Sequence, residues 1–164
     1  MASLDLSNVK ISAKDRIRGL ILPEHTTEKL AYICGILAGD GSIYIREKKH
    51  DYVIKCVGNP ADEKPLYDEI LFPLFQDLFN LKLEMKMHDS NTTYGFRIHS
   101  LGLLTFFRDV IGLPCGKKYG SLRIPELFKN DEKLKIAFIR GLADTDFCIS
   151  LKRGSRANPF YPVI

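Results

Sequence analysis

Two stretches far apart in the chain decide the fold: TEKLAYICGILAGDG, residues 27–41, and DEKLKIAFIRGLADTDF, residues 131–147. Each begins with charged residues, continues with apolar residues on most sides and carries small residues at four-residue steps, which predicts a buried helix. Each glycine inside a helix costs about 1 kcal/mol relative to alanine, so a close backbone contact must offset that cost. The sequence therefore predicts two helices that pack against each other through small residues, namely Gly35, Ala38, Gly39, Ala137 and Gly141.

The two stretches also align without a gap, AYICGILAGDGS against AFIRGLADTDFC, which indicates an internal repeat. In this alignment Asp40 corresponds to Asp146, so the repeat length is 146 − 40 = 106 residues. The second copy has Phe147 where the first copy has Gly41. Because only 164 − 146 = 18 residues follow Asp146, we expect a second unit that is truncated.

Alternating apolar and polar residues between the two helices predict four strands, and longer apolar stripes predict two more helices. The expected strands span residues 42–48, 52–58, 81–88 and 93–99, and the expected helices span 63–79 and 101–111. The helical stripes consist of Leu66, Ile70, Leu74 and Leu78, and of Leu104, Phe107 and Ile111. The order α-β-β-α-β-β-α predicts an α+β fold, a four-stranded antiparallel sheet with helices on one face.

The period of two along each strand divides the side chains of this sheet between two faces. If the apolar residues face the helices, the opposite face is basic and Glu84 is its only acid, whereas an ordinary solvated sheet face mixes both signs. This pattern predicts a surface that follows the phosphates of double-stranded DNA. The expected DNA-binding residues are Tyr44, Arg46, Lys48, Lys55, Lys82, Lys86, Arg97 and His99, joined by Lys152 and Arg153 near the C-terminus.

The composition is that of an ordinary globular chain, with 164 residues, 45% hydrophobic residues, 27% charged residues and a net charge of +4. This charge is compatible with a polyanionic partner but is too small to identify one. No apolar stretch reaches the roughly 20 residues that cross a membrane, and residues 1–20 lack the basic start and continuous apolar run typical of a secretory signal, so we expect a cytoplasmic, DNA-associated protein. The cysteines lack metal-site or redox spacing and are expected to be reduced and mostly buried; they are Cys34, Cys56, Cys115 and Cys148.

The two motif copies, ICGILAGDG at 33–41 and IRGLADTDF at 139–147, resemble those of the LAGLIDADG homing endonucleases. Three further stretches are similar to segments typical of archaeal members with two motifs: GNPADEK at 58–64, GLPCGKK at 112–118 and RIPELF at 123–128. The resemblance implies three parts, which are an N-terminal extension at 1–25, a first LAGLIDADG unit at 26–130 and the start of a second unit at 131–164.

The resemblance implies a site-specific endonuclease of the homing type, encoded within an intron or an intein, that hydrolyses double-stranded DNA. The close helix packing would place Asp40 beside Asp146, and neighbouring carboxylates are costly unless they share a proton or a cation. By resemblance, these two acids hold divalent ions, Mg²⁺ with Mn²⁺ as a substitute, together with the carbonyls of Gly39 and Thr145. A lysine of the preceding loop, Lys118 or Lys117, would add a positive charge at the scissile phosphate.

Two other functions remain open at this stage. The chain could be a non-catalytic nucleic-acid binder, such as an intron-splicing maturase or a DNA-binding regulator, or an inactive truncated remnant. Phe147 in place of glycine and the missing second sheet favour these hypotheses. A homodimer would restore a complete DNA-binding surface, although the second motif helix competes for the packing face of the first.

Overall fold

The computed structural model describes residues 2–118, 120, 122–146, 150–153 and 160–163. Its helices are α1 (Ala13–Ile17), α2 (Glu28–Gly39), α3 (Phe72–Phe79), α4 (Leu101–Thr105), α5 (Glu126–Lys129) and α6 (Glu132–Asp146). A π-helical segment, η2 (Leu66–Leu71), leads into α3, a second one, η3 (Phe106–Ile111), continues α4, and η1 (Glu47–Lys49) is a 3₁₀ turn. Its strands are β1 (Gly41–Arg46), β2 (Asp51–Gly58), β3 (Lys86–His88), β4 (Thr93–His99), β5 (Ser150–Arg153) and β6 (Phe160–Val163).

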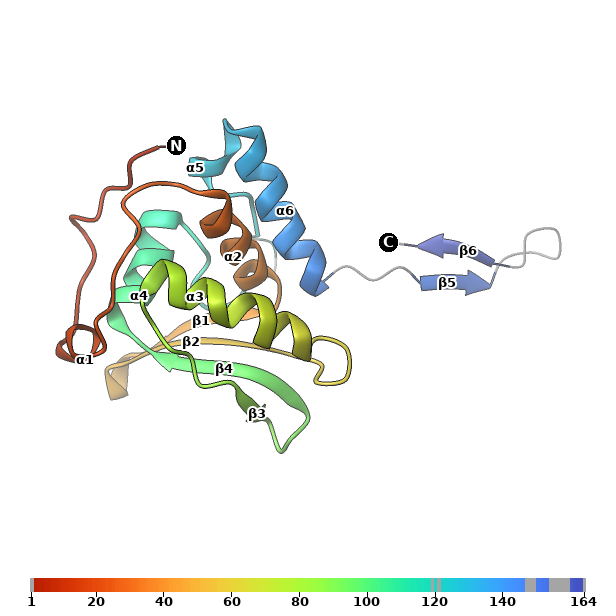
Figure 1. Cartoon of the computed structure of the whole chain (residues 1–164), viewed down its shortest axis with the longest axis horizontal. Helices are drawn as coiled ribbons and strands as arrows, with labels where there is room; N and C mark the ends of the chain where they lie inside the picture. The colour runs from red at the N-terminus through yellow and green to blue at the C-terminus, as the bar shows by residue number, and fades with distance from the viewer. Residues whose placement is uncertain (1, 119, 121, 147–149, 154–159, 164) are drawn as a thin grey trace.

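The first four strands form one antiparallel sheet in the order β1-β2-β4-β3. In the register, Ile54 of β2 lies opposite Ile43 of β1 and opposite Ile98 of β4, and all three side chains are buried. Helices α2, α3, α4 and α6 lie on the same side of this sheet (Figure 1). The structure confirms the α+β fold with one helix-covered face. The backbones of β5 and β6 pair with each other as a separate antiparallel hairpin.

The sheet is shorter than the alternation of residues predicts at two places. Strand β1 ends at Arg46, so Lys48 lies in the turn η1 and not on the strand, because the chain reverses there through His50, which has a positive φ of 47°. The expected strand at 81–88 joins the ladder only from Lys86 onward. Leu81 and Leu83 are buried in the core before that point. Alternation therefore predicted most of the buried face but not the extent of hydrogen bonding, and Met87, expected to face the helices, is 38% exposed.

The buried stripe on the helix between the two hairpins differs from the expected one. Ile70 is 40% exposed, and the fully buried positions are the next ones along the chain: Tyr67, Leu71, Phe75 and Phe79. Phe75 packs on Phe96 of the sheet with ring centroids 5.1 Å apart, and Phe79 packs on Phe106 and Phe107. Aromatic side chains bury the largest apolar area, so the stripe that contains Tyr67, Phe75 and Phe79 faces the core instead of the expected leucine and isoleucine stripe. The stripe Leu104, Phe107 and Ile111 is buried as expected.

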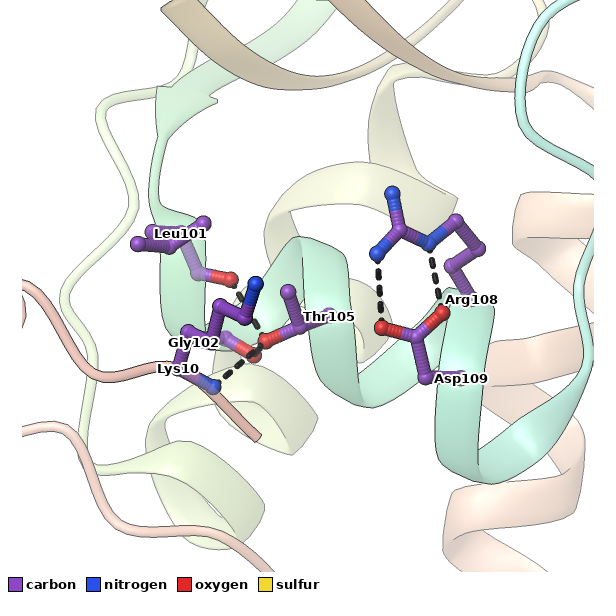
Figure 2. Close-up of polar contacts among 6 residues, drawn as sticks. All are labelled: Lys10, Leu101, Gly102, Thr105, Arg108 and Asp109. Carbon is purple, nitrogen blue, oxygen red and sulfur yellow. Dashed lines mark hydrogen bonds and ion pairs between the residues drawn. The ribbon is translucent and has the colours of Figure 1, made fainter. Parts of the chain in front are cut away.

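The N-terminal extension is fastened to the body of the fold at several points. A bridge pairs Ser3 with His25, which joins the two ends of the extension. The backbone N–H of Lys10 donates to Thr105 Oγ1 (3.1 Å), and that hydroxyl donates onward to the Leu101 carbonyl (2.8 Å), as Figure 2 shows. On the next helical turn, Arg108 and Asp109 form two parallel hydrogen bonds, also drawn in Figure 2.

Asp15 is the most deeply buried charged residue of this extension, with 1% of its surface exposed. Its Oδ2 accepts from the hydroxyl of Ser12 (2.7 Å) and from the backbone N–H of Gly102 (3.0 Å), and its Oδ1 accepts from the hydroxyl of Ser100 (2.6 Å). A carboxylate that receives several hydrogen bonds can be buried without a cationic partner. Asp15 therefore fixes α1 to the start of α4.

Two further expectations bear on the chain as a whole. Cys34 and Cys56 are free and buried, Cys115 is free but exposed, and Cys148 lies outside the described residues. In the part of the chain that the structure describes, no helix combines the length and the apolar character needed to cross a bilayer.

Candidate functional site

Helices α2 and α6 cross at a distance that only glycine allows. A methyl group built on Gly35 would lie 2.0 Å from the carbonyl oxygen of Phe138 in α6. A methyl group on Gly141 would lie 2.1 Å from the carbonyl oxygen of Tyr32 in α2. The two contacts are reciprocal, as an internal repeat folded about a local two-fold axis requires. Of the other small residues at this contact, Ala38 is buried and Ala137 is half-buried.

This crossing brings the two motif acids to the same end of the helix pair. A methyl group on Gly39 would lie 2.1 Å from Thr145 Oγ1 and 3.2 Å from Asp146 Oδ2. Asp40 is the C-cap of α2, and Asp146 is the last residue of α6. The structure therefore places Asp40 and Asp146 at the same end of the helix pair, where α2 leads into β1, close enough for the charge of Asp146 to raise the pKa of Asp40.

The surroundings of Asp40 disfavour its negative charge. Tyr67, which is fully buried, donates its hydroxyl to Asp40 Oδ2 (3.1 Å). Burial raises the pKa of Asp40 to about 6, the negative charges of Glu63 and Asp146 add to that rise, and the Tyr67 hydrogen bond and the Lys118 charge oppose it. The site is thus one in which an added cation would be favourable.

Glu63 is a third carboxylate at this position, and the sequence analysis did not identify it. A methyl group on Gly58 would lie 1.6 Å from Glu63 Oε2 and 2.9 Å from Asp40 Oδ2, so the two carboxylates converge over Gly58. Glu63 Oε2 also accepts from the backbone N–H of Asn59 (2.5 Å). The only available signal was the stretch GNPADEK at 58–64, whose turn folds Glu63 back over the end of β2.

Lys118 reaches the same end of α2 from the loop before α5. Its Nζ donates to the carbonyl oxygens of Leu37 (3.0 Å), Ala38 (2.9 Å) and Gly39 (2.5 Å). These carbonyls carry the partial negative charge of the helix C-terminus, which stabilises a cation. Burial lowers the pKa of Lys118, while the nearby negative charges, including those of Asp146 and Asp40, oppose that shift. The structure thus brings Lys118 to the two acids, whereas Lys117 is exposed in the loop.

The sheet face opposite the helices carries more acids than the sequence analysis expected. Asp51, the first residue of β2, pairs with Arg46 (2.8 Å) and with His99. Asp89, in the turn after β3, pairs with Lys55 (2.6 Å). The expectation of Glu84 as the only acid was wrong, because β2 begins one residue earlier than expected and the turn folds back over the sheet.

Basic side chains still dominate this face. Arg46 lies over the ring of Tyr44, 5.7 Å from its centroid, and Lys86 pairs with Glu84 (2.9 Å). Arg97 and Lys82 are exposed and contact no carboxylate among the described residues. Lys48 lies in η1 and is exposed. The side chains of Lys152 and Arg153 lie outside the described part of the structure.

Comparison with known proteins gives a match in structure alone. No family model and no curated protein matches the sequence. A mesophilic variant of the homing endonuclease I-DmoI is similar with a TM-score of 0.53 and 22% identity, over 72% of this chain and 60% of that chain. An I-DmoI variant in complex with its nicked target DNA and Mn gives a TM-score of 0.52 at the same identity and coverage. The fold is that of the LAGLIDADG homing endonucleases.

A third solved structure, the LAGLIDADG homing endonuclease I-LtrWI bound to target DNA, gives a TM-score of 0.47 at 13% identity, over 82% of this chain and 64% of that chain. The chain spans about 60% of the length of the I-DmoI structures. The described residues contain one four-stranded sheet of the LAGLIDADG fold and the two motif helices.

The donor atoms at the ends of α2 and α6 fit a hard divalent cation. Asp40 and Asp146 present carboxylate oxygens, which Mg²⁺ and Mn²⁺ prefer. Within the described residues, no three Asp, Glu, His or Cys side chains form a metal-binding group on their own, so a substrate phosphate would have to supply further ligands. The Gly39 carbonyl accepts from Lys118, and the Thr145 hydroxyl donates back into α6 to Leu142 (3.1 Å).

Proposed function

We propose that this chain is a site-specific, metal-dependent endonuclease of double-stranded DNA, of the homing type. The observation that carries the proposal is the convergence of Asp40 and Asp146 at the ends of two helices that cross through Gly35 and Gly141. A close pair of carboxylates is unfavourable unless a cation or a proton is shared. The pKa of Asp40 is raised to about 6 mainly by burial, and the charges of Glu63 and, to a smaller extent, Asp146 add to the rise.

Each residue of the site has a distinct role in this proposal. A divalent ion, Mg²⁺ or Mn²⁺, would supply positive charge at the scissile phosphate and an activated water. Asp40 and Asp146 hold that ion, and the Tyr67 hydroxyl orients the Asp40 carboxylate. Lys118 keeps an ammonium group beside the two acids, where it would stabilise charge that develops on the phosphate.

The basic face of the sheet would hold the DNA. A two-stranded ribbon fits the major groove, where arginine and lysine side chains reach the edges of guanine. Arg46, Lys55 and Lys86 each contact an acid in the free protein, and these surface pairs contribute at most about 1 kcal/mol, so phosphates can replace the acids. The same face carries Arg97 and His99 on β4.

The proposal is tested by selecting a target and then measuring nicking. Duplexes enriched from a random pool by binding to the chain are incubated with it in Mg²⁺ or in EDTA. We expect cleavage in Mg²⁺ only, and Asp40→Asn should abolish cleavage while leaving duplex affinity nearly unchanged. Asp144→Asn, two residues before Asp146 and hydrogen-bonded to Tyr32, is the matched control and should still cleave. Cleavage by Asp40→Asn would refute the assignment.

A non-catalytic nucleic-acid binder, such as a maturase or a regulator, is the second candidate. The contact that favours it is the one between Lys118 and the Gly39 carbonyl, because the ammonium lies where the LAGLIDADG resemblance places a metal ligand. The same enriched duplexes separate the two functions. Tight binding without nicking in either Mg²⁺ or Mn²⁺ would select the binder.

The number of DNA-binding sheets in the chain bears on whether one copy can bind a full target. We infer that residues 26–130 are a complete LAGLIDADG unit and that residues 131–164 begin a second one. One sheet would cover about half of a target, so a second copy or a further segment would be needed to bind a full site. Because α6 already occupies the small-residue face of α2, a homodimer would have to form through other surfaces. Light scattering with and without the enriched duplex measures the stoichiometry.

A further inference from the structure

A cavity of about 690 Å³ lies at the edge of the sheet, where the chain approaches β3. Its lining is strongly basic, and Glu84 is its only acid among the described residues. The basic and histidine residues that line it are Arg18, Lys82, Lys86, His88, Arg97 and His99. None of them belongs to the acidic site at the ends of α2 and α6.

The cavity exists because the β3–β4 ladder stops early. The last pair in register is Lys86 with Gly95, and the residues before Lys86 separate from β4 without pairing to it. The outward side chains of Arg97 and His99 therefore face an open space instead of a neighbouring strand. The buried Leu81 and Leu83 hold the separated segment against the core, so the opening is built into the fold.

Arg18 enters this space from the N-terminal extension. Its Nη1 donates to the backbone carbonyl of His99 (2.6 Å), a bond that uses one of the five N–H donors of the guanidinium. The neighbouring Gly19 carbonyl accepts from Asn80 Nδ2 (3.0 Å), and the N–H of Ile21 donates to the Phe79 carbonyl (3.1 Å). The hydrogen bond to the His99 carbonyl holds the guanidinium at the end of β4, and the buried Asp15 fixes the preceding helix α1 to α4.

The polar groups in the cavity are suited to an anion. Lys82 and Arg97 contact no carboxylate in the described part of the chain, and Lys86 contacts only Glu84 at the rim. His88 Nε2 is buried and has no hydrogen-bond partner. Burial lowers the pKa of His88, a hydrogen bond from its ring to the Gly95 backbone opposes that shift, and the charges of Lys55, Arg97 and Lys86 add to it, which reflects how many cations surround the cavity. Several cationic side chains around one cavity, two of them without a carboxylate partner among the described residues, are satisfied by an oxyanion.

We propose that this cavity binds a backbone phosphate of double-stranded DNA and that Arg18 makes the N-terminal extension part of the DNA interface. The choice of DNA as the source of the phosphate rests on the proposed function. The cavity is continuous with the basic sheet face through Lys86, Arg97 and His99, so a duplex lying on that face would reach it at its flank. Arg18 would add affinity without reading bases, because a phosphate carries no sequence information.

The test compares duplex affinity for single variants at several salt concentrations, measured by fluorescence anisotropy. Arg18→Ala and Lys82→Ala should each weaken binding by about tenfold, equally for cognate and scrambled duplexes. The slope of log K against log salt should fall by about 0.9 for each phosphate that a variant no longer neutralises. Arg16→Ala, on α1 but outside the cavity, is the matched control and should bind as the wild type does. Arg18→Lys should keep most of the salt slope.

A second readout reports on the cavity without DNA. Titration with inorganic phosphate should shift the ring resonances of His88 in the wild type but not in Arg18→Ala. A wild type that binds and cleaves duplexes, with Arg18→Ala unchanged in affinity and salt slope, overturns this inference alone. A wild type that binds no duplex overturns the proposed function and, with it, the assignment of DNA to the cavity.

Discussion

The side chain of Asp15 is buried and that of Asp40 is half-buried, but the groups around them have opposite effects on a negative charge. Asp15 accepts hydrogen bonds from two serine hydroxyls and from backbone N–H groups, and no carboxylate is among its neighbours in those contacts. Asp40 has one hydroxyl donor, Tyr67, and two carboxylates nearby, those of Glu63 and Asp146. Burial disfavours both charges, but hydrogen bonds hold the pKa of Asp15 below its usual value whereas the pKa of Asp40 rises to about 6.

The difference separates a structural acid from a candidate functional one. A carboxylate whose charge is fully satisfied by donors contributes to stability, and its removal leaves those donors without an acceptor. A carboxylate whose charge is opposed by like charges lowers stability until a cation or a proton arrives. The first kind fastens an extension to the fold, and the second kind is what a cation-binding site requires.

Asp15→Asn should give the largest loss of stability, about 3 kcal/mol at pH 7, because the amide cannot accept all the bonds that the carboxylate receives. The pKa of Asp15 is lowered in the fold, so its contribution is present above the unfolded pKa near 3.8 and is lost as the pH falls through the folded value. Urea unfolding at pH 7 and pH 3 measures both effects. Asp5→Asn, at an exposed carboxylate, is the control; an equal loss for both variants would contradict the comparison.

Divalent ions should stabilise the chain through the Asp40 site. At ten times the dissociation constant, Mg²⁺ or Mn²⁺ should add about 1.4 kcal/mol to the unfolding free energy of the wild type. Asp40→Asn should show almost none of this gain, and Asp15→Asn should show all of it despite its lower baseline. Thermal melting with increasing metal and a matched ionic strength in NaCl measures the difference. A gain that survives in Asp40→Asn would place the ion elsewhere.

The sequence was sufficient to predict that α2 and α6 cross closely. Glycine weakens a helix, and small residues repeated every four positions are best explained by close packing against a second helix. It was less informative about what surrounds each helix. The alignment matches Leu30 to Ile136 and Ile33 to Ile139, yet the first of each pair is fully buried while Ile136 is 58% and Ile139 44% exposed. Helix α2 lies between α6 and the sheet, whereas the described residues cover only one side of α6 (Figure 1).

The parts that sequence reasoning missed depend on contacts between distant segments. Glu63 joins the site through the turn at 58–64, and Arg18 joins the basic cavity because Asp15 fixes α1 to α4. Arg18 lies in no motif or periodic pattern, and the stretch GNPADEK at 58–64 does not by itself say that Glu63 turns toward Asp40. The acid on the sheet face, Asp51, was missed because a strand boundary shifted by one residue, and such boundaries are the least certain feature of a sequence pattern.

Asp40→Asn should raise stability by about 1 kcal/mol at pH 7 in metal-free buffer, after allowance for solvent screening of a half-buried group. Because the pKa of Asp40 is raised to about 6 in the fold, its charge lowers the stability of the wild type progressively as the pH rises from about 4 to 6, and that loss persists above pH 6. The advantage of Asp40→Asn should therefore disappear near pH 4. Urea unfolding in EDTA between pH 4 and pH 7 measures the difference in unfolding free energy between the variant and the wild type. A variant less stable than the wild type at pH 7 would contradict the proposed charge repulsion.

Tyr67→Phe should give the smallest effect, about 0.5 to 1 kcal/mol, because the hydrogen bond that it removes is long for an O–H···O bond (3.1 Å) and the ring is kept. The loss should be greatest above pH 6, where Asp40 is charged, and should shrink as Asp40 becomes protonated. In the double variant Tyr67→Phe with Asp40→Asn, the two effects should not add, because the hydroxyl no longer has a charged acceptor. Additive effects would mean that Tyr67 acts through Cys56, its other polar neighbour at 3.7 Å, and not through the candidate metal site.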